Sequence, residues 1–546
     1  MFSKNDKSLQ NIRPFSVYDW MTFFLIAAFF CVNVVTLMAF PTVHSDELWL
    51  KGIAIEILDQ GRFDVTEPFY DLYPRVIHPF RWLYNSLLII ALKTYGPSVV
   101  AVRLVALIFG TLCLPLVYEI ARKHFESPLY GLAATFMMCL DIQFIYSSHL
   151  GRQETIILFL LLLGYWLILK DDVKYKVPKL SLLILLGMGV HPNSFILGVC
   201  FAVLLFYKWL MREARFSHFL KLVLMTAIGA LFYAIIGYLM NPNFIEGYLN
   251  FGKTLGVDTE SISRFEGFYW YWYKLFNQIG GTYDLFDIKL PLILLGLLAL
   301  IWLPLLLIAL TKVTHNLTTR QEASVFYPFV TVIGIALSIL VIGRYNQTSI
   351  VFMTPFICLL TLQSLHLALS AYGRLFNKKS PILLPALLLV LAMLWGSNLW
   401  SNLKTYETNR FYSKSYDAML NEIAAYVPEN SVVLGNLNII EAFNQNRFYD
   451  IRNLGYLDTS TNAFQNYVES RNIQYIILHE EMDYIARTSP KWDFLYVTID
   501  YYDAMQAYLA SHTTRIHAFE NPLYAMRISS FSGTYPWQTV IYKVDE

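Results

Sequence analysis

The chain has 546 residues, of which 56% are hydrophobic and only 15% are charged. A soluble domain carries about 25% charged residues, so the composition excludes an ordinary soluble protein. The formal net charge of +1 excludes nucleic-acid binding through bulk charge. All five cysteines lie inside apolar segments, which excludes a disulfide framework and a cysteine-based metal site.

Apolar segments suited to crossing a bilayer recur along most of the chain. The apolar stretch over 180–207 is too long for one span, and His191-Pro192 interrupts it. Because proline disfavours helix at the residue before it, two short helices are expected to turn there. We therefore predict about eleven transmembrane helices, over residues 18–40, 97–121, 128–147, 154–170, 180–190, 193–207, 218–240, 289–311, 324–343, 348–371 and 381–401.

Lysine and arginine are concentrated in alternate connections between these spans, as in Arg122-Lys123 and Lys378-Lys379. Cytoplasmic connections carry such an excess, so the N-terminus is predicted to be cytoplasmic. An odd number of crossings then puts the segment after residue 401 on the extracytoplasmic face.

The composition turns polar after Asn402. Helical patterns at 415–427 and 462–470 alternate with apolar runs at 431–436 and 473–478, which is typical of a small α/β domain.

The predicted fold is a polytopic α-helical membrane domain over 1–401, followed by a soluble extracytoplasmic α/β domain over 402–546. The membrane domain has two large outer loops, 41–96 and 241–288. The second loop carries an aromatic run at 268–273, expected to be an interfacial belt or, alternatively, a platform for lipid or sugar.

An acidic pair, Asp46-Glu47, directly follows the first span. Acidic side chains close to the hydrocarbon boundary are costly, and they point to a functional site. Both residues are candidate catalytic groups. The alternative is structural, with Ser45 or Asp46 capping a helix that begins at Glu47, and Asp46 could both cap and react.

The predicted topology brings two further features to the same outer face. Arg152 and Glu154 precede the fourth span, where Glu154 is a catalytic candidate or a carboxylate favoured by the helix dipole. His191, at the turn between the two short helices, is a substrate-binding candidate or a buried core histidine. We expect Asp46, Glu154 and His191 to face one cleft. A site built from several loops at the membrane surface suits a substrate with a lipid tail and a polar head.

Other polar residues near this face are candidate substrate-binding groups. Alternatively, these residues are ordinary polar groups of loops near the lipid headgroups, or long side chains that extend to the membrane interface. They are His78, Arg81, Arg103, Arg152, Arg344 and Tyr345.

In order and spacing, residues 18–210 resemble the N-terminal half of the GT-C membrane glycosyltransferases. The nearest branch contains the protein O-mannosyltransferases and the lipid A aminoarabinose transferases. Beyond residue 210 the resemblance is mainly hydropathy, together with Arg344-Tyr345. The matching motifs are Asp46-Glu47, Gly61-Arg62-Phe63, His78-Pro79, Gly96, Arg103-Leu104, Gly151-Arg152-Gln153-Glu154 and Gly189-Val190-His191-Pro192.

The resemblance implies a GT-C-like fold, a polyprenyl-phosphate-linked sugar as donor, and Asp46 as catalytic base. It points to a glycan, lipid or protein acceptor in the cell envelope and to a prokaryotic plasma membrane. Ile77-His78-Pro79 stands where many relatives have Lys-Pro-Pro, and Glu154 stands where some have Asp, so donor and acceptor stay open.

The chemistry of the residues agrees with that resemblance. A carboxylate can take the proton of an acceptor hydroxyl. The leaving phosphate needs cations rather than a general acid, and the candidates, which the sequence does not rank, are Arg81, Arg103, Arg152 and Arg344. No histidine and carboxylate pattern has metal-ligand spacing, so no cofactor or essential metal is predicted.

A polytopic lipid-sugar transporter or flippase, or a polymerase without this chemistry, is the competing interpretation. Many transporters bind substrate near the bilayer midplane, at interrupted helices. Acidic residues gathered in one outer cleft favour the enzyme, whereas a central membrane cavity favours transport.

The predicted topology can be tested with single cysteines at Lys378 and Asp503. We expect a membrane-impermeant thiol reagent to label position 503 from outside intact cells and position 378 only after permeabilisation. Labelling of both positions from the same side would contradict the orientation and the outer-face site.

Overall fold

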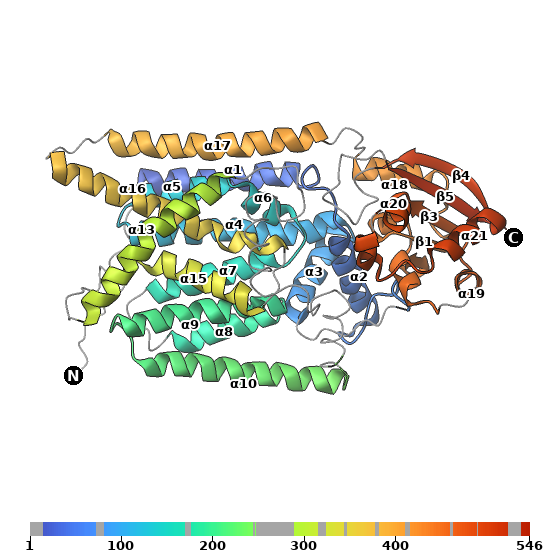
Figure 1. Ribbon diagram of the computed structural model, residues 1–546, viewed down its shortest axis with the longest axis horizontal. Helices are drawn as coiled ribbons and strands as arrows, with labels where there is room; N and C mark the ends of the chain where they lie inside the picture. Colours follow the sequence, from blue (N-terminus) through green and yellow to red (C-terminus); the bar gives the residue numbers. More distant parts are fainter. Residues whose placement is uncertain are drawn as a thin grey trace.

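A long helical bundle carries a smaller α/β domain at one end (Figure 1). The structure, a computed structural model, describes residues 15–72, 81–169, 176–243, 246, 289–314, 324–342, 347–376, 382–409, 415–458, 462–488, 490–521 and 537–545. The aromatic run at 268–273 lies outside these residues.

In the described part of the chain, six helical segments are long and apolar enough to cross a membrane, and a pair of helices bent by 65° makes a seventh. The six are α1 (Val17–Thr36), α4 (Val99–His124), η3 with α9 (Pro192–Ser194 and Phe195–Leu210), α10 (Phe216–Met240), η4 with α16 (Gln347–Phe352 and Thr354–Phe376) and α17 (Leu383–Asn409). The bent pair is α5 (Pro128–Cys139) and α6 (Ile142–His149).

Four further apolar helices are shorter over their described residues. They are α7 (Glu154–Leu169), α8 (Val177–Met188), α13 (Lys289–Thr314) and α15 (Tyr327–Ile342). Each predicted span coincides with one of these segments, which confirms the polytopic helical fold. By length alone the described residues give six or seven spans, fewer than eleven, because α7, α8 and α15 have 16 residues or fewer and the apolar helix within α13 covers only Gly296–Lys312.

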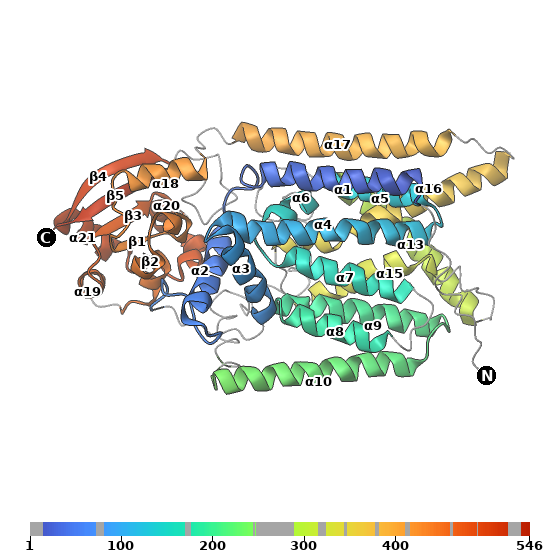
Figure 2. The same ribbon diagram turned by 180° about the vertical axis from the view of Figure 1, so that it is seen from behind.

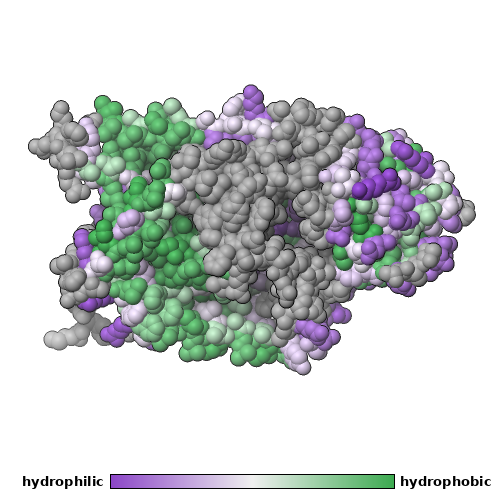
Figure 3. All heavy atoms as spheres, in the orientation of Figure 1, coloured by the Kyte–Doolittle hydropathy of each residue, from purple (hydrophilic) through white to green (hydrophobic). Residues whose placement is uncertain are grey.

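The outer helices present apolar side chains to their surroundings. In α10 and in α17 only 6% of the most apolar window is buried, against 78% in α16. Both lie at edges of the bundle in the two opposite views (Figures 1 and 2). The bundle surface is mainly apolar, whereas the C-terminal domain is largely polar (Figure 3). This distribution is that of an integral membrane protein with a water-exposed domain.

Two helices of the first loop lie where the bundle meets the C-terminal domain (Figures 1 and 2). They are α2 (Ser45–Gln60) and α3 (Trp82–Tyr95). Helix α2 begins at Ser45, and its first turn holds the acidic residues Asp46 and Glu47, which the helix dipole favours there. It ends at its C-cap Gly61, which has the left-handed conformation typical of glycine at a helix end.

The C-terminal domain contains a five-stranded mixed sheet in the order β2-β1-β3-β5-β4, and it confirms the predicted α/β character. β1 pairs in parallel with β2 and β3, while β5 pairs antiparallel with β3 and β4. The strands are β1 (Val433–Gly435), β2 (Phe448–Asp450), β3 (Tyr475–His479), β4 (Thr513–Glu520) and β5 (Gln538–Val544).

Helices and 3-10 turns connect these strands. The preceding helix α17 continues past the expected boundary at 401 to Asn409. The connections are α18 (Tyr416–Ala424), η5 (Leu437–Ala442), η6 (Gln445–Arg447), η7 (Ile451–Tyr456), α19 (Ala463–Ser470), α20 (Glu481–Thr488), η8 (Pro490–Tyr496) and α21 (Tyr502–His512).

The two faces of the sheet belong to different cores, because successive strand residues point to opposite sides. Leu434 and Ile476 pack in one cluster with residues of α19, α20 and α21. Val433 and Ile477 pack in the other, which also contains Val43 from the first loop. The second face of the sheet is therefore continuous with the membrane domain.

Candidate active site

The site is built on the first turn of α2. His44 is the N-cap: its Nδ1 accepts a hydrogen bond from the backbone N–H of Asp46 at 3.1 Å. Glu47 Oε2 accepts one from the backbone N–H of His44 at 2.8 Å, which completes a capping box. The expectation that Ser45 or Asp46 caps a helix starting at Glu47 is therefore wrong. The helix starts at Ser45, which leaves the Asp46 side chain available for other contacts.

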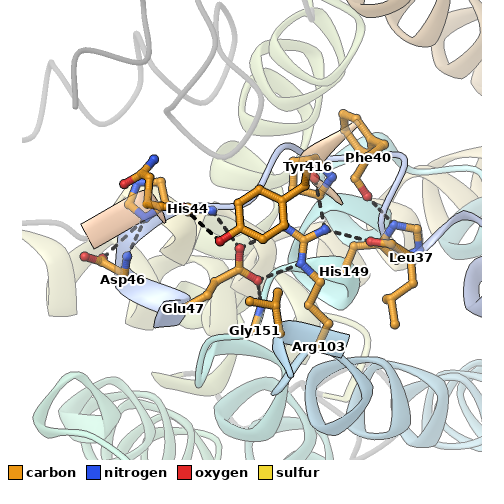
Figure 4. A network of polar contacts seen from close by, with 12 residues as sticks. Leu37, Phe40, His44, Asp46, Glu47, Arg103, His149, Gly151 and Tyr416 are labelled. Carbon is orange, nitrogen blue, oxygen red and sulfur yellow. Dashed lines mark hydrogen bonds and ion pairs between the residues drawn. The ribbon is translucent and has the colours of Figure 1, made fainter. Parts of the chain in front are cut away.

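A buried ion pair fixes this turn to the bundle. Arg103, on α4, donates from Nε and from an NH2 group to the two oxygens of Glu47, each at 2.8 Å. The second terminal nitrogen of Arg103 donates to the carbonyls of Leu37 at 2.7 Å and Pro41 at 3.0 Å, at the end of the first span. Both charged side chains have no exposed surface (Figure 4).

The ion pair bears on the roles of Glu47 and Arg103, both of which the sequence predicted as site residues. Four donors surround the Glu47 carboxylate: two from Arg103, one from His44 and one from Gly151. Neither Glu47 nor Arg103 reaches solvent. The geometry therefore gives both residues a positioning function beneath the site.

The loop before α7 is held by the same carboxylate. The backbone N–H of Gly151 donates to Glu47 Oε1 at 2.7 Å, and the hydroxyl of Tyr84 donates to the Gly151 carbonyl at 2.9 Å. A Cβ at Gly151 would lie 2.6 Å from Val102 Cγ1 and 3.0 Å from Glu47 Oε1. Glycine is needed here because the backbone approaches the carboxylate so closely.

Arg152 contacts both Asp46 and Glu154, the two carboxylates that the predicted topology placed on one face. Its terminal NH1 group donates to Asp46 Oδ2, and its Nε lies 3.4 Å from Glu154 Oε1. Glu154 is almost fully buried, whereas a third of the Asp46 side chain is exposed. Asp46 is thus the carboxylate of the pair that a substrate can reach.

The charges around Asp46 keep it ionised. Partial burial would raise the pKa of its carboxyl group, but neighbouring positive charges outweigh that effect and hold the pKa well below its ordinary value. In decreasing order of influence they belong to Arg152, His44, Arg452 and Arg81. Arg452 comes from the C-terminal domain, and no sequence motif pointed to it.

Arg81 lies over an aromatic ring at the edge of this cluster. Its guanidinium carbon is 4.6 Å from the centre of the Trp49 ring, a cation–π distance. Trp49 in turn donates from Nε1 to Glu67 Oε1 at 2.5 Å. Sequence reasoning missed Trp49 and Glu67; the one available signal was that Trp49 follows Asp46 by three residues and so lies near the same helix face.

His191 belongs to the same end of the bundle, through α3. Its Nδ1 accepts from the backbone N–H of Asn193 at 3.0 Å and so caps the short 3-10 helix. The carbonyl of Gly189, just before it, accepts from the backbone N–H groups of Leu83 at 2.9 Å and Tyr84 at 3.3 Å. The structure connects the turn to the Arg152 loop by way of Tyr84. His78, Arg344 and Tyr345 lie outside the described residues.

An apolar pocket of about 420 Å³ opens between α3 and α10. Trp82, the residue after Arg81, donates from Nε1 to the hydroxyl of Tyr233 at 2.8 Å across this pocket. The pocket therefore lies between α10 and the first residues of α3, the helix that begins directly after Arg81. Its lining residues are Phe63, Trp82, Asn85, Phe232, Tyr233, Ile236 and Met240. Among the residues described, no group of three or more His, Cys, Asp or Glu could hold a metal ion.

These features define a class: a polytopic membrane protein with a charged site at the end of its bundle, beneath a mixed α/β domain. Known structures share this fold. ArnT from Cupriavidus metallidurans bound to undecaprenyl phosphate matches with a TM-score of 0.51 and 12% identity, over 96% of this chain and 98% of that one. Its apo form matches with a TM-score of 0.50 and 11% identity over the same shares.

ArnT is a lipid A aminoarabinose transferase of the GT-C type, so the fold that the sequence resemblance implied is confirmed. No protein-family model matches the sequence, and no curated protein matches it in sequence comparison.

Because Glu47 positions the turn, its substitution should lower the stability of the fold, whereas substitution of the neighbouring Asp46 should not. Glu47→Gln leaves the Arg103 charge buried and uncompensated, which should lower the free energy of unfolding by about 3–5 kcal/mol. Asp46→Asn, one residue away but partly exposed, should unfold close to the wild type. Equilibrium unfolding in mixed detergent micelles measures both. Wild-type stability of Glu47→Gln would show that the buried pair does not fix the turn.

Proposed function

We propose that this protein is an integral membrane glycosyltransferase. It moves a hexosyl or pentosyl group from a polyprenyl-phosphate-linked donor to an acceptor hydroxyl on the outer face, with Asp46 as base. The observation that carries the proposal is the arrangement around Arg152, which binds an accessible Asp46 and a buried Glu154. Helix α3, whose Tyr84 holds the loop of Arg152, also lines the apolar pocket. The ArnT-like fold supports the same kind of reaction.

The reaction needs one proton acceptor and neutralisation of one leaving group. The acceptor oxygen attacks the anomeric carbon of the sugar, and its proton passes to the Asp46 carboxylate. The bond between that carbon and the phosphate oxygen breaks, and the lipid phosphate leaves with the electron pair. Arg152 and Arg81 stabilise the charge that develops on the phosphate.

The ion pair between Asp46 and Arg152 links donor binding to base strength. In the free protein Arg152 keeps the pKa of Asp46 low, which makes the carboxylate a weak base. A donor phosphate competes for Arg152, because arginine binds phosphate with paired hydrogen bonds. As Arg152 turns to the phosphate, the pKa of Asp46 rises and the base becomes stronger with the donor in place.

The apolar pocket supports a lipid-linked donor. It lies beside α10, in which only 6% of the most apolar window is buried, and Trp82 on its wall directly follows Arg81. A prenyl chain in this pocket would bring its phosphate to the arginines. ArnT was solved with undecaprenyl phosphate, a ligand of this class.

The position of the carboxylates favours the enzyme over a transporter. Asp46 and Glu154 start helices at the bundle end that meets the C-terminal domain, whereas a transporter site is expected near the midplane. A cytoplasmic N-terminus in a prokaryotic plasma membrane, with the C-terminal domain outside, completes the proposal.

The function is tested by Asp46→Asn. Because His44 forms the cap, Asn at 46 keeps the helix start while it removes the proton acceptor. Turnover of a defined polyprenyl-phosphate sugar should fall by about 10²–10⁴-fold. In cells, mass spectrometry should show the lipid-linked sugar accumulating and a surface glycan losing that sugar.

The matched control is Asp64→Asn in the same loop, where the aspartate forms an exposed ion pair with Arg62. It should retain wild-type turnover. Turnover of Asp46→Asn within about threefold of the wild type would remove Asp46 from the mechanism.

The pH dependence tests the link to Arg152. Removing an opposite charge destabilises the carboxylate form, so Arg152→Gln should raise the pKa of Asp46. The acid limb of kcat/KM, which reports the free enzyme, should therefore move to higher pH in this variant. Arg62→Gln, which removes an exposed arginine of the same loop, should leave the limb unchanged. An unshifted limb in Arg152→Gln would contradict the coupling.

A further inference from the structure

The C-terminal domain shares a hydrophobic core with the turn that carries Asp46. Val43 and Leu48, on either side of that turn, are fully buried in one cluster with side chains of η5 and the sheet. Leu437 and Ile440 are among those side chains. The domain is therefore packed against the start of α2.

Hydrogen bonds attach η7 to the same place. The backbone N–H of Asp450 and the side-chain amide of Asn453 both donate to the carbonyl of Phe69, at 3.0 and 2.9 Å. The Phe69 ring lies against Gly52 of α2, so close that a Cβ there would meet it at 2.5 Å. Residues 450–453 are thus fixed relative to α2 through a single aromatic residue.

Ion pairs hold the interface at two further points. Lys51 Nζ lies 2.5 Å from Glu441 Oε1, and both side chains are largely buried. Asp71 accepts from Tyr467 at 2.9 Å and from Arg471 at 2.6 Å. These contacts, spread along α2 and the first loop, hold the C-terminal domain, η7 included, against the loop that contains Asp46.

Arg452 lies in this fixed turn. Its backbone N–H donates to Asp450 Oδ1 at 2.8 Å, and its Nε donates to the Leu495 carbonyl at 3.1 Å. In the described part of the chain its terminal NH1 and NH2 groups have no protein partner. Its positive charge is also among those that lower the pKa of Asp46.

We propose that Arg452 is an acceptor-binding residue, whose guanidinium recognises an anionic group, phosphate or carboxylate, close to the acceptor hydroxyl. The inference rests on the proposed function. Its basis is that the arginines around Asp46 come from two different domains. Arg81 and Arg152 belong to the membrane domain, whereas Arg452 comes from the water-exposed domain. A planar guanidinium with two unused NH2 groups suits a bidentate contact with an anion.

The test measures binding, with the donor phosphate site already filled. Full-length protein in nanodiscs is loaded with undecaprenyl phosphate, and glucose 6-phosphate and glucose are titrated calorimetrically as an anionic and a neutral hydroxyl probe. Wild-type protein should bind the phosphorylated sugar about tenfold more tightly, the order expected for a charge-assisted contact. Arg452→Gln should abolish this preference, and Arg452→Lys should keep most of it.

The lysine variant separates charge from packing, because lysine keeps the charge but cannot reproduce the bond to Leu495. Arg447→Gln is the matched control: Arg447 is an exposed arginine of the same domain that also binds a main-chain carbonyl, that of Asn430. It should behave like the wild type.

Three results would overturn the inference: no preference in the wild type, an unchanged preference in Arg452→Gln, or equal loss in Arg452→Lys and Arg452→Gln. Failure of the proposed function is distinct, since it would appear as no binding of undecaprenyl phosphate to any variant. The comparison of Arg452→Gln with Arg447→Gln in lipid-free protein would still decide the role of Arg452.

Discussion

The buried ion pair between Glu47 and Arg103 is the interaction on which the site depends. It joins the end of α1, the start of α2, the α4 helix and the Gly151 loop through one carboxylate and one guanidinium. Two charges without solvent access are tolerated because hydrogen bonds surround both, and removal of either partner would leave an uncompensated buried charge. This pair fixes the backbone next to two site residues: Asp46, which precedes Glu47 in the helix, and Arg152, which follows Gly151 in the loop.

The accessible charges have a different organisation. Arg152 is shared between Asp46 and Glu154, so in the free protein its positive charge is already paired. An anionic substrate must displace one of these contacts, and the exposed one, to Asp46, is the easier to break. Under the proposed function, Glu154 keeps Arg152 oriented during that exchange. The proposal thus gives the two carboxylates of unequal burial different roles, Asp46 as the base and Glu154 as the partner that holds the cation.

The sequence predicted the helices well and the site only in outline. Hydropathy identifies membrane segments because lipid contact demands long apolar runs, and the alternation of crossings brought Asp46, Arg152 and Glu154 to one face before any contact was known. It could not show that His44 rather than Ser45 caps α2, since histidine is an unusual cap. It also could not show that Arg103 faces a buried carboxylate rather than a phosphate. Both outcomes depend on tertiary packing that no local pattern records.

The sequence could not point to Arg452 as a site residue, because Arg452 lies some four hundred residues after Asp46 in a separate domain. One face of the small sheet completes its core with Val43 and Leu48 of the first loop as well as with its own helix α18, which packs the domain against the start of α2. Under the proposed function this packing divides the work between domains. The membrane domain supplies the lipid pocket, the base and the phosphate-binding cations, and the C-terminal domain supplies the contact on the side that faces water. Changes confined to η7 can then alter which acceptor is used while the donor site, fixed by the Glu47–Arg103 pair, stays as it is.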